Sequence, residues 1–355
     1  MSVWDAVVGQ DRAVDALTRL ADNPVHAYLF IGPEGCGKED AARAFATLLL
    51  TESTDASTRD ARLIAQGSHP SVIEVLREGA AVDKEEADNV IRLAATTPTE
   101  GKLKIVVVHE VHLMRDSAAV RLLKTIEEPA ERIVFILLAD HLVPSLATIN
   151  SRCVVVNFSR LADDVVADAL TNDGIEPSAA ETVAIMAGGN LTRARLLAHD
   201  PRAILRQQAF ASVPKRLDGT GNTVTQLVDE LFRHIDDAIA PLTAQHEREL
   251  AQLEERVAMT GERGSGRKAL QDRHKRQIRK FKTDELRNGL AVIAATYRDA
   301  LIDNAGNTDT IATAIHRIHK TTAALGLNTN EELALQALLL QCPSLMSMTH
   351  ASAVQ

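Results

Sequence analysis

The sequence predicts a parallel α/β domain followed by two helical domains. Residues 1–158 alternate short runs of Val, Ile and Leu with helical patterns, which is typical of a parallel sheet covered by helices. Residues 206–355 show an almost continuous helical pattern, with proline only at positions 214, 241 and 343. A glycine-rich segment at 32–38 separates the first apolar run from the first long helical pattern, as in a phosphate-binding strand–loop–helix unit.

Each predicted element of the α/β domain has a local signal. Helix 39–50 follows the glycine-rich segment, and helix 117–128 ends at Pro129, because proline cannot continue a helix. The predicted strands are residues 26–31, 72–76, 103–108, 133–138 and 154–158.

The composition changes after residue 159 and predicts three domains. We expect an α/β core at 1–159, a small helical domain at 160–205 with a stop at Gly188-Gly189, and an all-helical domain at 206–355. Within the last lies a charged helical hairpin at about 243–290, broken at 261–266. Residues 263–282 contain nine Lys or Arg and one acidic residue. A solvated helical hairpin and a DNA-contacting one both fit that pattern.

Bulk composition excludes several classes of protein. The chain has 355 residues and a formal charge of −9, which argues against a wholly basic nucleic-acid binder. Cys36, Cys153 and Cys342 lie too far apart for a metal or disulfide spacing, so reduced thiols are expected. No signal peptide or membrane-spanning run is evident, and we expect a cytoplasmic protein without a membrane partner.

The segment Gly32–Glu39 resembles a phosphate-binding loop with one residue changed. The pattern G-x-x-x-x-G-K-[ST] uses Gly32, Gly35 and Gly37 to curl backbone N–H groups around phosphates, and Lys38 to pair with them. Glu39 occupies the position of the hydroxyl that normally helps to hold Mg²⁺. This pattern predicts at most weak binding of ATP or ADP, with no cofactor required.

The residues that follow the predicted strand at 103–108 also indicate a nucleotide site without the usual magnesium ligands. His109 stands where a magnesium-binding carboxylate is usual, and Glu110 stands where a carboxylate orients the attacking water. Hydrolysis is therefore not expected. A metal site formed by His109 and His112 is a weaker interpretation than a polar strand end. A catalytic pair formed by Glu127 and Glu128 is likewise a weaker interpretation than two solvated charges at a helix end.

Four further segments resemble one protein family. They are Val8-Gly9-Gln10, the helix Leu122–Pro129 (LLKTIEEP), the segment Thr148–Cys153 (TINSRC), and Gly189–Ala194. Together with the phosphate loop they resemble the AAA+ clamp-loader subunits of bacterial DNA polymerase III, in particular the delta-prime group of actinobacterial type. The resemblance covers residues 1–205 by motif and the remainder by helical character.

This resemblance implies that the subunits of one ring have different roles. Five AAA+ subunits would form an open ring through helical collar domains, with residues 160–205 as the lid and 206–355 as the collar. Arg152 would act in trans as an arginine finger on ATP bound by a neighbour, and Arg193 would be the second sensor of a degenerate site. Implied partners are gamma/tau and delta subunits, and through the complex the sliding clamp and primer–template DNA. The chain would then lack intrinsic catalysis within a DNA-directed DNA polymerase holoenzyme, with an active gamma/tau-type ATPase as the alternative.

Two departures from the family pattern stand out. Many clamp-loader subunits carry a four-cysteine zinc module before an HPD-like segment, whereas residues 51–68 contain no cysteine, so zinc is not expected. The end of the predicted strand at 133–138 continues with Ala139-Asp140 and lacks the Asn or Thr usual for a first sensor.

Overall fold

The computed structural model describes residues 1–77, 81–97, 100–200, 202–260, 267–303, 307–325 and 330–345. They form two compact units, Met1–Asp200 and Pro201–Gln355. The break predicted at 261–266 lies outside the described residues. In the part of the chain described, we find no helix with the length and apolar character needed to cross a bilayer.

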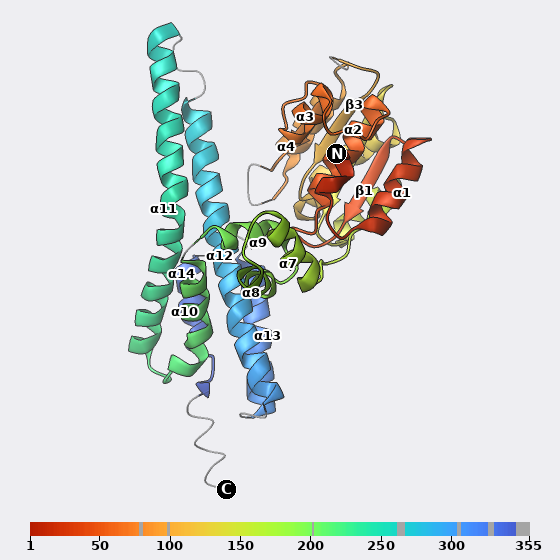
Figure 1. Ribbon diagram of the computed structural model, residues 1–355. Coiled ribbons are helices and arrows are strands. Elements are labelled where there is room, and N and C mark those ends of the chain that lie inside the picture. The colour runs from red at the N-terminus through yellow and green to blue at the C-terminus, as the bar shows by residue number, and fades with distance from the viewer. Residues whose placement is uncertain are drawn as a thin grey trace. The chain divides into compact units, whose positions relative to one another are not determined.

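The first unit contains a five-stranded parallel sheet, which confirms the predicted fold class (Figure 1). Its strand order is β2-β3-β4-β1-β5. The strands are β1 (Ala27–Ile31), β2 (Val72–Val75), β3 (Lys104–Val108), β4 (Ile133–Ala139) and β5 (Val154–Asn157). All five predicted strands are therefore present, each with one end shifted by one residue.

Helices cover both faces of this sheet. Alternate strand residues point to opposite faces, so Tyr28 and Phe30 pack in one apolar layer and Ala27 and Leu29 in the other. Helices α1 to α3 cover the first face, and α4 and α5 cover the second. The helical elements of the unit are η1 (Val3–Ala6), α1 (Asp11–Ala21), α2 (Lys38–Thr51), α3 (Arg59–Ala65), α4 (Lys84–Ala94), η2 (Val111–Leu113), α5 (Asp116–Glu127), η3 (Pro144–Leu146), α6 (Ala147–Asn150), α7 (Asp163–Asn172), α8 (Pro177–Ala187) and α9 (Leu191–Ala198).

Helices α7 to α9 form the small helical part of the first unit. The predicted glycine stop is confirmed, because α8 ends at Ala187 and Gly188 follows in the left-handed conformation at φ +60°. Asn190 then caps α9 by accepting a hydrogen bond from the backbone N–H of Arg193 at 2.8 Å.

The second unit is all-helical, as predicted. Its helices are α10 (Ala203–Arg216), α11 (Gly221–Thr260), α12 (Arg267–Ile302), α13 (Thr308–Ala324) and α14 (Glu331–Leu339). Helices α11 and α12 are the longest, and they lie side by side in the unit (Figure 1). Gly289 of α12 lets the ring of Phe210 approach closely, since a Cβ there would lie 2.2 Å from a ring carbon. The prediction of three separate domains stays a prediction.

Candidate nucleotide site and arginine edge

The phosphate-binding loop connects β1 to α2 at the carboxyl edge of the sheet. Gly35 and Gly37 have φ values of +70° and +92°, which favour glycine, and Gly37 caps the N-terminus of α2. Gly32 has no room for a side chain, because a Cβ would lie 2.6 Å from that of Phe158. The loop therefore has the backbone of an anion cradle at a helix N-terminus.

Lys38 is held by two carboxylates of its own chain. Its Nζ lies 2.8 Å from Asp140 and 3.3 Å from Glu39, and it donates to the carbonyl of Pro33 at 3.2 Å. The Lys38 side chain is 3% exposed. Burial lowers the pKa of Lys38, but the charges of Glu39 and Asp140 outweigh burial and raise that pKa above its ordinary value. The lysine is thus charged and already paired.

The strand order explains why Asp140 reaches Lys38. Strand β4 is a direct neighbour of β1, so the residue after β4 lies beside the loop after β1. The backbone N–H of Asp140 donates to Nδ1 of His112 at 3.1 Å, which leaves the proton of the neutral ring on Nε2, 3.4 Å from the Asp140 carboxylate. Burial lowers the pKa of His112, in keeping with a neutral ring. Sequence reasoning treated Asp140 only as a missing sensor and did not identify it as a partner of Lys38.

His109 directly follows β3 and has Glu74 as a partner within the fold. Its Nε2 lies 3.0 Å from Glu74 of β2, and Arg43 of α2 forms two hydrogen bonds to the same carboxylate at 2.7 and 2.9 Å. Burial raises the pKa of Glu74, but the hydrogen bonds from His109 and Arg43 outweigh it and lower the pKa to about 2. His109 and His112 therefore contact different carboxylates, and the two rings do not share one ligand position.

Glu110, the candidate water-orienting carboxylate, is paired with Arg77. The Nε of Arg77 lies 2.8 Å from Glu110, and a second guanidinium nitrogen lies 3.4 Å from the other oxygen. Glu110 also has a left-handed backbone at φ +52°, which is unusual for a residue other than glycine. Its carboxylate thus contacts Arg77, which lies just after β2.

The small helical part of the unit closes over the loop. The N–H of Leu191 donates to the carbonyl of Gly35 at 3.0 Å, and a Cβ on Gly35 would lie 1.8 Å from Oδ1 of Asn190. Gly35 is thus needed both for its backbone conformation and for this close approach. Arg193 is half-buried in the first turn of α9, and so it belongs to the element that contacts the loop.

Gln10, from the segment Val8-Gly9-Gln10, ties the N-terminus to the same loop. Its side-chain amide donates to the carbonyls of Cys36 at 2.9 Å and Ser159 at 2.6 Å, and its oxygen accepts from the N–H of Ser159 at 3.1 Å. Gly9 has a φ of +66°, and a Cβ there would lie 2.8 Å from Val165. This segment therefore connects the loop to the start of α7.

Arg152 lies at the opposite edge of the sheet. It precedes β5, whose first residue Val154 pairs with Tyr28 near the start of β1, so Arg152 lies at the amino edge. The length of β1 alone separates the two edges by about 16 Å. Arg152 is 39% exposed; its Nη1 donates to the carbonyl of Thr148 and to Ser151, each at 3.0 Å.

Arg152 also pairs with Glu127 at the end of α5. Glu127 is 38% exposed, in keeping with a solvated charge at this helix end, and it has Arg152 as a surface partner. Cys153 packs beneath the pair in the apolar layer, and burial raises its pKa to about 12. The raised pKa keeps this thiol protonated and so disfavours the reactive thiolate.

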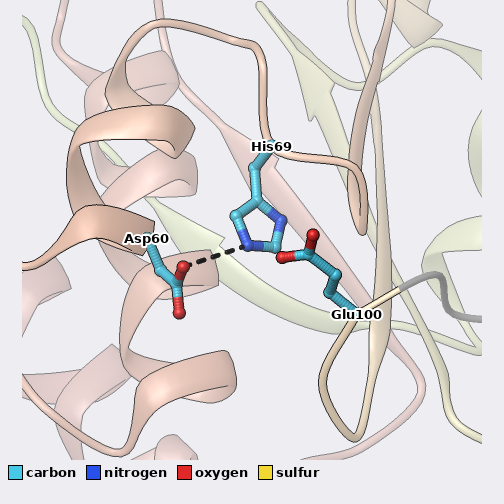
Figure 2. A group of neighbouring side chains, drawn as sticks. All are labelled: Asp60, His69 and Glu100. Carbon is cyan, nitrogen blue, oxygen red and sulfur yellow. Dashed lines mark ion pairs between the residues drawn. The ribbon is translucent and has the colours of Figure 1, made fainter.

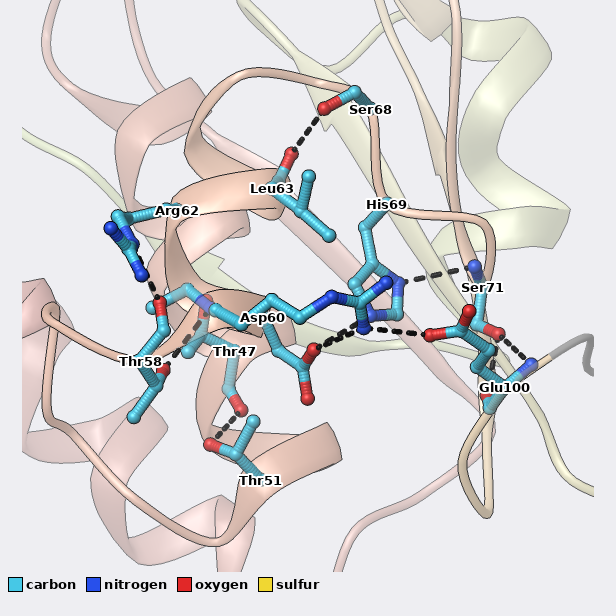
Figure 3. Close-up of polar contacts among 12 residues, drawn as sticks. Thr47, Thr51, Thr58, Asp60, Arg62, Leu63, Ser68, His69, Ser71 and Glu100 are labelled. Carbon is cyan, nitrogen blue, oxygen red and sulfur yellow. Dashed lines mark hydrogen bonds and ion pairs between the residues drawn. The ribbon is translucent and has the colours of Figure 1, made fainter.

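One group of three potential metal ligands lies elsewhere in the described structure. Asp60, His69 and Glu100 bring one ligand atom each within 4.8 Å of the others (Figure 2). However, Nδ1 of His69 accepts the N–H of Ser71 at 3.1 Å, so Nε2 carries the proton of the neutral ring and is not a free ligand (Figure 3).

The two carboxylates of this group, Asp60 and Glu100, already accept hydrogen bonds from Arg59. Nη1 of Arg59 donates to Asp60 at 3.3 Å and to Glu100 at 3.0 Å, so a cation would have to displace a guanidinium. Ser71 joins the group to the backbone by donating its hydroxyl to the carbonyl of Glu100 at 2.5 Å. The donors fit a polar cluster that links α3 to the loop before β3 better than they fit a metal centre.

Comparison with known proteins agrees with this architecture. Residues 9–162 match the family model described as DNA polymerase III, delta subunit. The tau subunit of Escherichia coli DNA polymerase III is 30% identical over 71% of this chain, and the delta-prime subunit of Bacillus subtilis is 30% identical over 46%. The chain spans 40% and 51% of the length of these two relatives.

Among solved structures, a gamma subunit-related protein from Thermotoga maritima is similar with 14% identity and a TM-score of 0.46, covering 95% of this chain and 99% of that one. The region matched by the family model contains the loop of Lys38 and the segment of Arg152. Residues 9–162 are therefore similar in sequence to subunits of DNA polymerase III, among them delta-prime and tau, which supports a clamp-loader subunit.

Proposed function

We propose that this chain is a delta-prime-like stator of a replicative clamp loader. It would work in the cytoplasm beside gamma/tau and delta subunits, and would help to load the sliding clamp on primer–template DNA. In this proposal its own nucleotide site does not hydrolyse ATP, and Arg152 completes the ATP site of a neighbouring subunit. The observation that carries the proposal is the pairing of buried Lys38 with Asp140 and Glu39.

The charges around Lys38 support the loss of catalysis. A triphosphate would meet two carboxylates where a working site offers a hydroxyl and a magnesium ion. Glu39 and Asp140 would repel the phosphates, and each already neutralises part of the lysine charge. The remaining cradle of Gly32, Gly35 and Gly37, with Arg193 on the lid, leaves weak binding of ATP or ADP as the expectation.

The position of Arg152 supports action on another subunit. A guanidinium at the amino edge is too far from Lys38, at the carboxyl edge, to stabilise phosphate bound in its own chain. Arg152 can also leave Glu127 at a small cost in free energy, because ion pairs between exposed side chains contribute about 0–1 kcal/mol.

The test is the ATPase activity of the assembly with gamma/tau and delta, in the presence of primed DNA and clamp. Arg152→Ala should slow ATP turnover by ~10³-fold at the one site that Arg152 serves, which is the size of effect seen for arginine fingers. The total ATPase rate of the assembly should therefore fall by at least the contribution of that site. Glu127→Ala is the matched control, because it removes the intrachain partner of Arg152 and leaves the guanidinium. Unchanged turnover with Arg152→Ala, or equal losses in both variants, would contradict the proposed role.

A second candidate function is a gamma/tau-type ATPase. Its support is the intact glycine–lysine loop and the alignment of the Escherichia coli tau subunit over 71% of the chain. This candidate requires Mg²⁺-dependent ATP turnover by the isolated chain that is abolished by Lys38→Ala. The stator proposal requires that the isolated chain show none.

A further inference from the structure

The phosphate-binding loop and the start of α9 touch at Gly35. The carbonyl of Gly35 accepts the backbone N–H of Leu191 at 3.0 Å, and both residues are buried. The side chain of Asn190 lies directly against Gly35, since a Cβ on that glycine would be 1.8 Å from Oδ1 and 2.3 Å from Cγ of Asn190. The loop and the helix therefore meet with no room for a further side chain between them.

Asn190 is held in this position by its own helix. Its Oδ1 accepts the N–H of Arg193 at 2.8 Å, which makes it the N-cap of α9. Gly189 precedes it with a φ of +81°, and a Cβ there would lie 2.6 Å from the carbonyl oxygen of Leu161. The side chain of Asn190 thus cannot turn away from Gly35 without breaking the cap of α9.

A second group of contacts joins the same two parts of the first unit. The side-chain amide of Gln10 donates to the carbonyls of Cys36 and Ser159, so it connects the loop to the residues before α7. Gly9 lies against Val165 of α7. All of these contacts join protein groups to protein groups, and none uses a phosphate as a bridge. They therefore need no nucleotide to form.

We propose that Gly35, Asn190 and Leu191 form a latch that fixes helices α7 to α9 on the phosphate-binding loop in the absence of nucleotide. A ligand shifts the balance between two positions of these helices only as far as it binds one of them better, and the latch already favours one. Losing its hydrogen bond would leave the buried carbonyl of Gly35 without a donor, which is unfavourable. The use of the latch rests on the proposed function, because a stator needs a shape that nucleotide does not change.

The test measures the position of α9 in the isolated full chain. Spin labels at Val120→Cys in α5 and Leu196→Cys in α9, two side chains that are each 62% exposed, would report the distance between these helices by double electron–electron resonance. Cys36 and Cys342 are buried, and Cys153 would be replaced by Ser, so that only the introduced cysteines react. The labelled parent should show one narrow distance, and the same distance with Mg–ADP.

Leu191→Pro removes the N–H of the latch and keeps the helix, because proline is favoured at the first position of a helix. The preceding residue, Asn190, already has the extended backbone that proline favours. Loss of one buried hydrogen bond should raise the population of a second, open distance by about fivefold. Leu191→Ala is the matched control, since it also shortens the apolar side chain but keeps the N–H, and it should keep the single distance.

A second pair of variants tests the contact with Asn190. Gly35→Ala places a methyl group 1.8 Å from Oδ1 of Asn190 and should also produce the open distance. Gly37→Ala is its control, because Gly37 has a positive φ as well, at +92°, but a Cβ there meets nothing within 4 Å. It should therefore keep the distance of the parent.

A broad distribution in the parent that becomes narrow with Mg–ADP would overturn the proposal, as would a parent distance that changes with Mg–ADP. The proposal would also fail if Leu191→Pro or Gly35→Ala behaved as its control does. None of these outcomes bears on the action of Arg152 on a neighbour, which the ATPase activity of the assembly decides.

Discussion

Lys38 and Arg152 lie at opposite edges of one sheet and have opposite surroundings. Lys38 is 3% exposed and paired with two carboxylates of its own chain, whereas Arg152 is 39% exposed and paired with one exposed carboxylate. A buried cation cannot give up its partners without a large desolvation cost, but a surface cation can exchange them at little cost. The comparison teaches that Lys38 is held inside its own chain, whereas Arg152 lies partly exposed at the surface.

The largest expected effect is on ATP turnover by the assembly, which should depend on Arg152 and not on Lys38. Arg152→Lys keeps the charge but loses the planar fork that binds phosphate oxygens, so turnover should fall at least about tenfold. Lys38→Ala should leave the same rate within about twofold, since no step depends on this lysine. Steady-state ATPase measurements on the reconstituted complex would decide, and the reverse ranking would break the comparison.

The next prediction restores the missing features of the loop. Glu39→Thr with Asp140→Asn removes both carboxylates around Lys38 and supplies the hydroxyl that helps to hold Mg²⁺. Affinity of the isolated chain for Mg–ADP should rise at least about tenfold, as measured by titration calorimetry.

Adding Lys38→Ala to that pair of substitutions is the control and should cancel the gain. If the paired substitutions leave nucleotide affinity unchanged, the carboxylates are not what weakens the site.

A third prediction concerns stability and pH at Glu74. A pKa of about 2 in the folded chain means that the ionised carboxylate stabilises the fold above its unfolded pKa of about 4.5, and that this contribution is lost as pH falls towards 2. Glu74→Gln should therefore lower the free energy of unfolding by about 2–3 kcal/mol at pH 7.

The difference between the parent and Glu74→Gln should shrink between pH 5 and pH 2, as the parent loses the same contribution. Urea unfolding at several pH values would measure it. A difference that stays constant with pH would show that lost packing, rather than the charge on Glu74, causes the effect.

The smallest effect is expected at the amino edge. Glu127→Ala removes the partner of Arg152, and because both side chains are over a third exposed, the free energy of unfolding should change by less than about 1 kcal/mol. Thermal unfolding of the two proteins would test this. A loss as large as that of Glu74→Gln would mean that Arg152 is a structural residue.

The order of elements was predictable because its signals are local. Apolar runs gave the five strands, Pro129 marked the end of α5, and Gly188 marked the end of α8. The residues of the loop were also predictable, since Gly35 and Gly37 are needed for their backbone conformations. The pairing of Lys38 with Asp140, of His109 with Glu74 and of Arg152 with Glu127 was not, because these partners are far apart in the sequence.

The sequence alone determined which chemical groups exist: a glycine loop with Glu39 in place of a hydroxyl, His109 in place of a carboxylate, and an arginine before the last strand. Tertiary structure decided which of them meet. Placing β4 beside β1 brings Asp140 to Lys38, and placing β2 beside β3 gives His109 to Glu74. Strand order decides this because the carboxyl ends of neighbouring parallel strands share one edge, and no local pattern in the chain specifies which strands become neighbours.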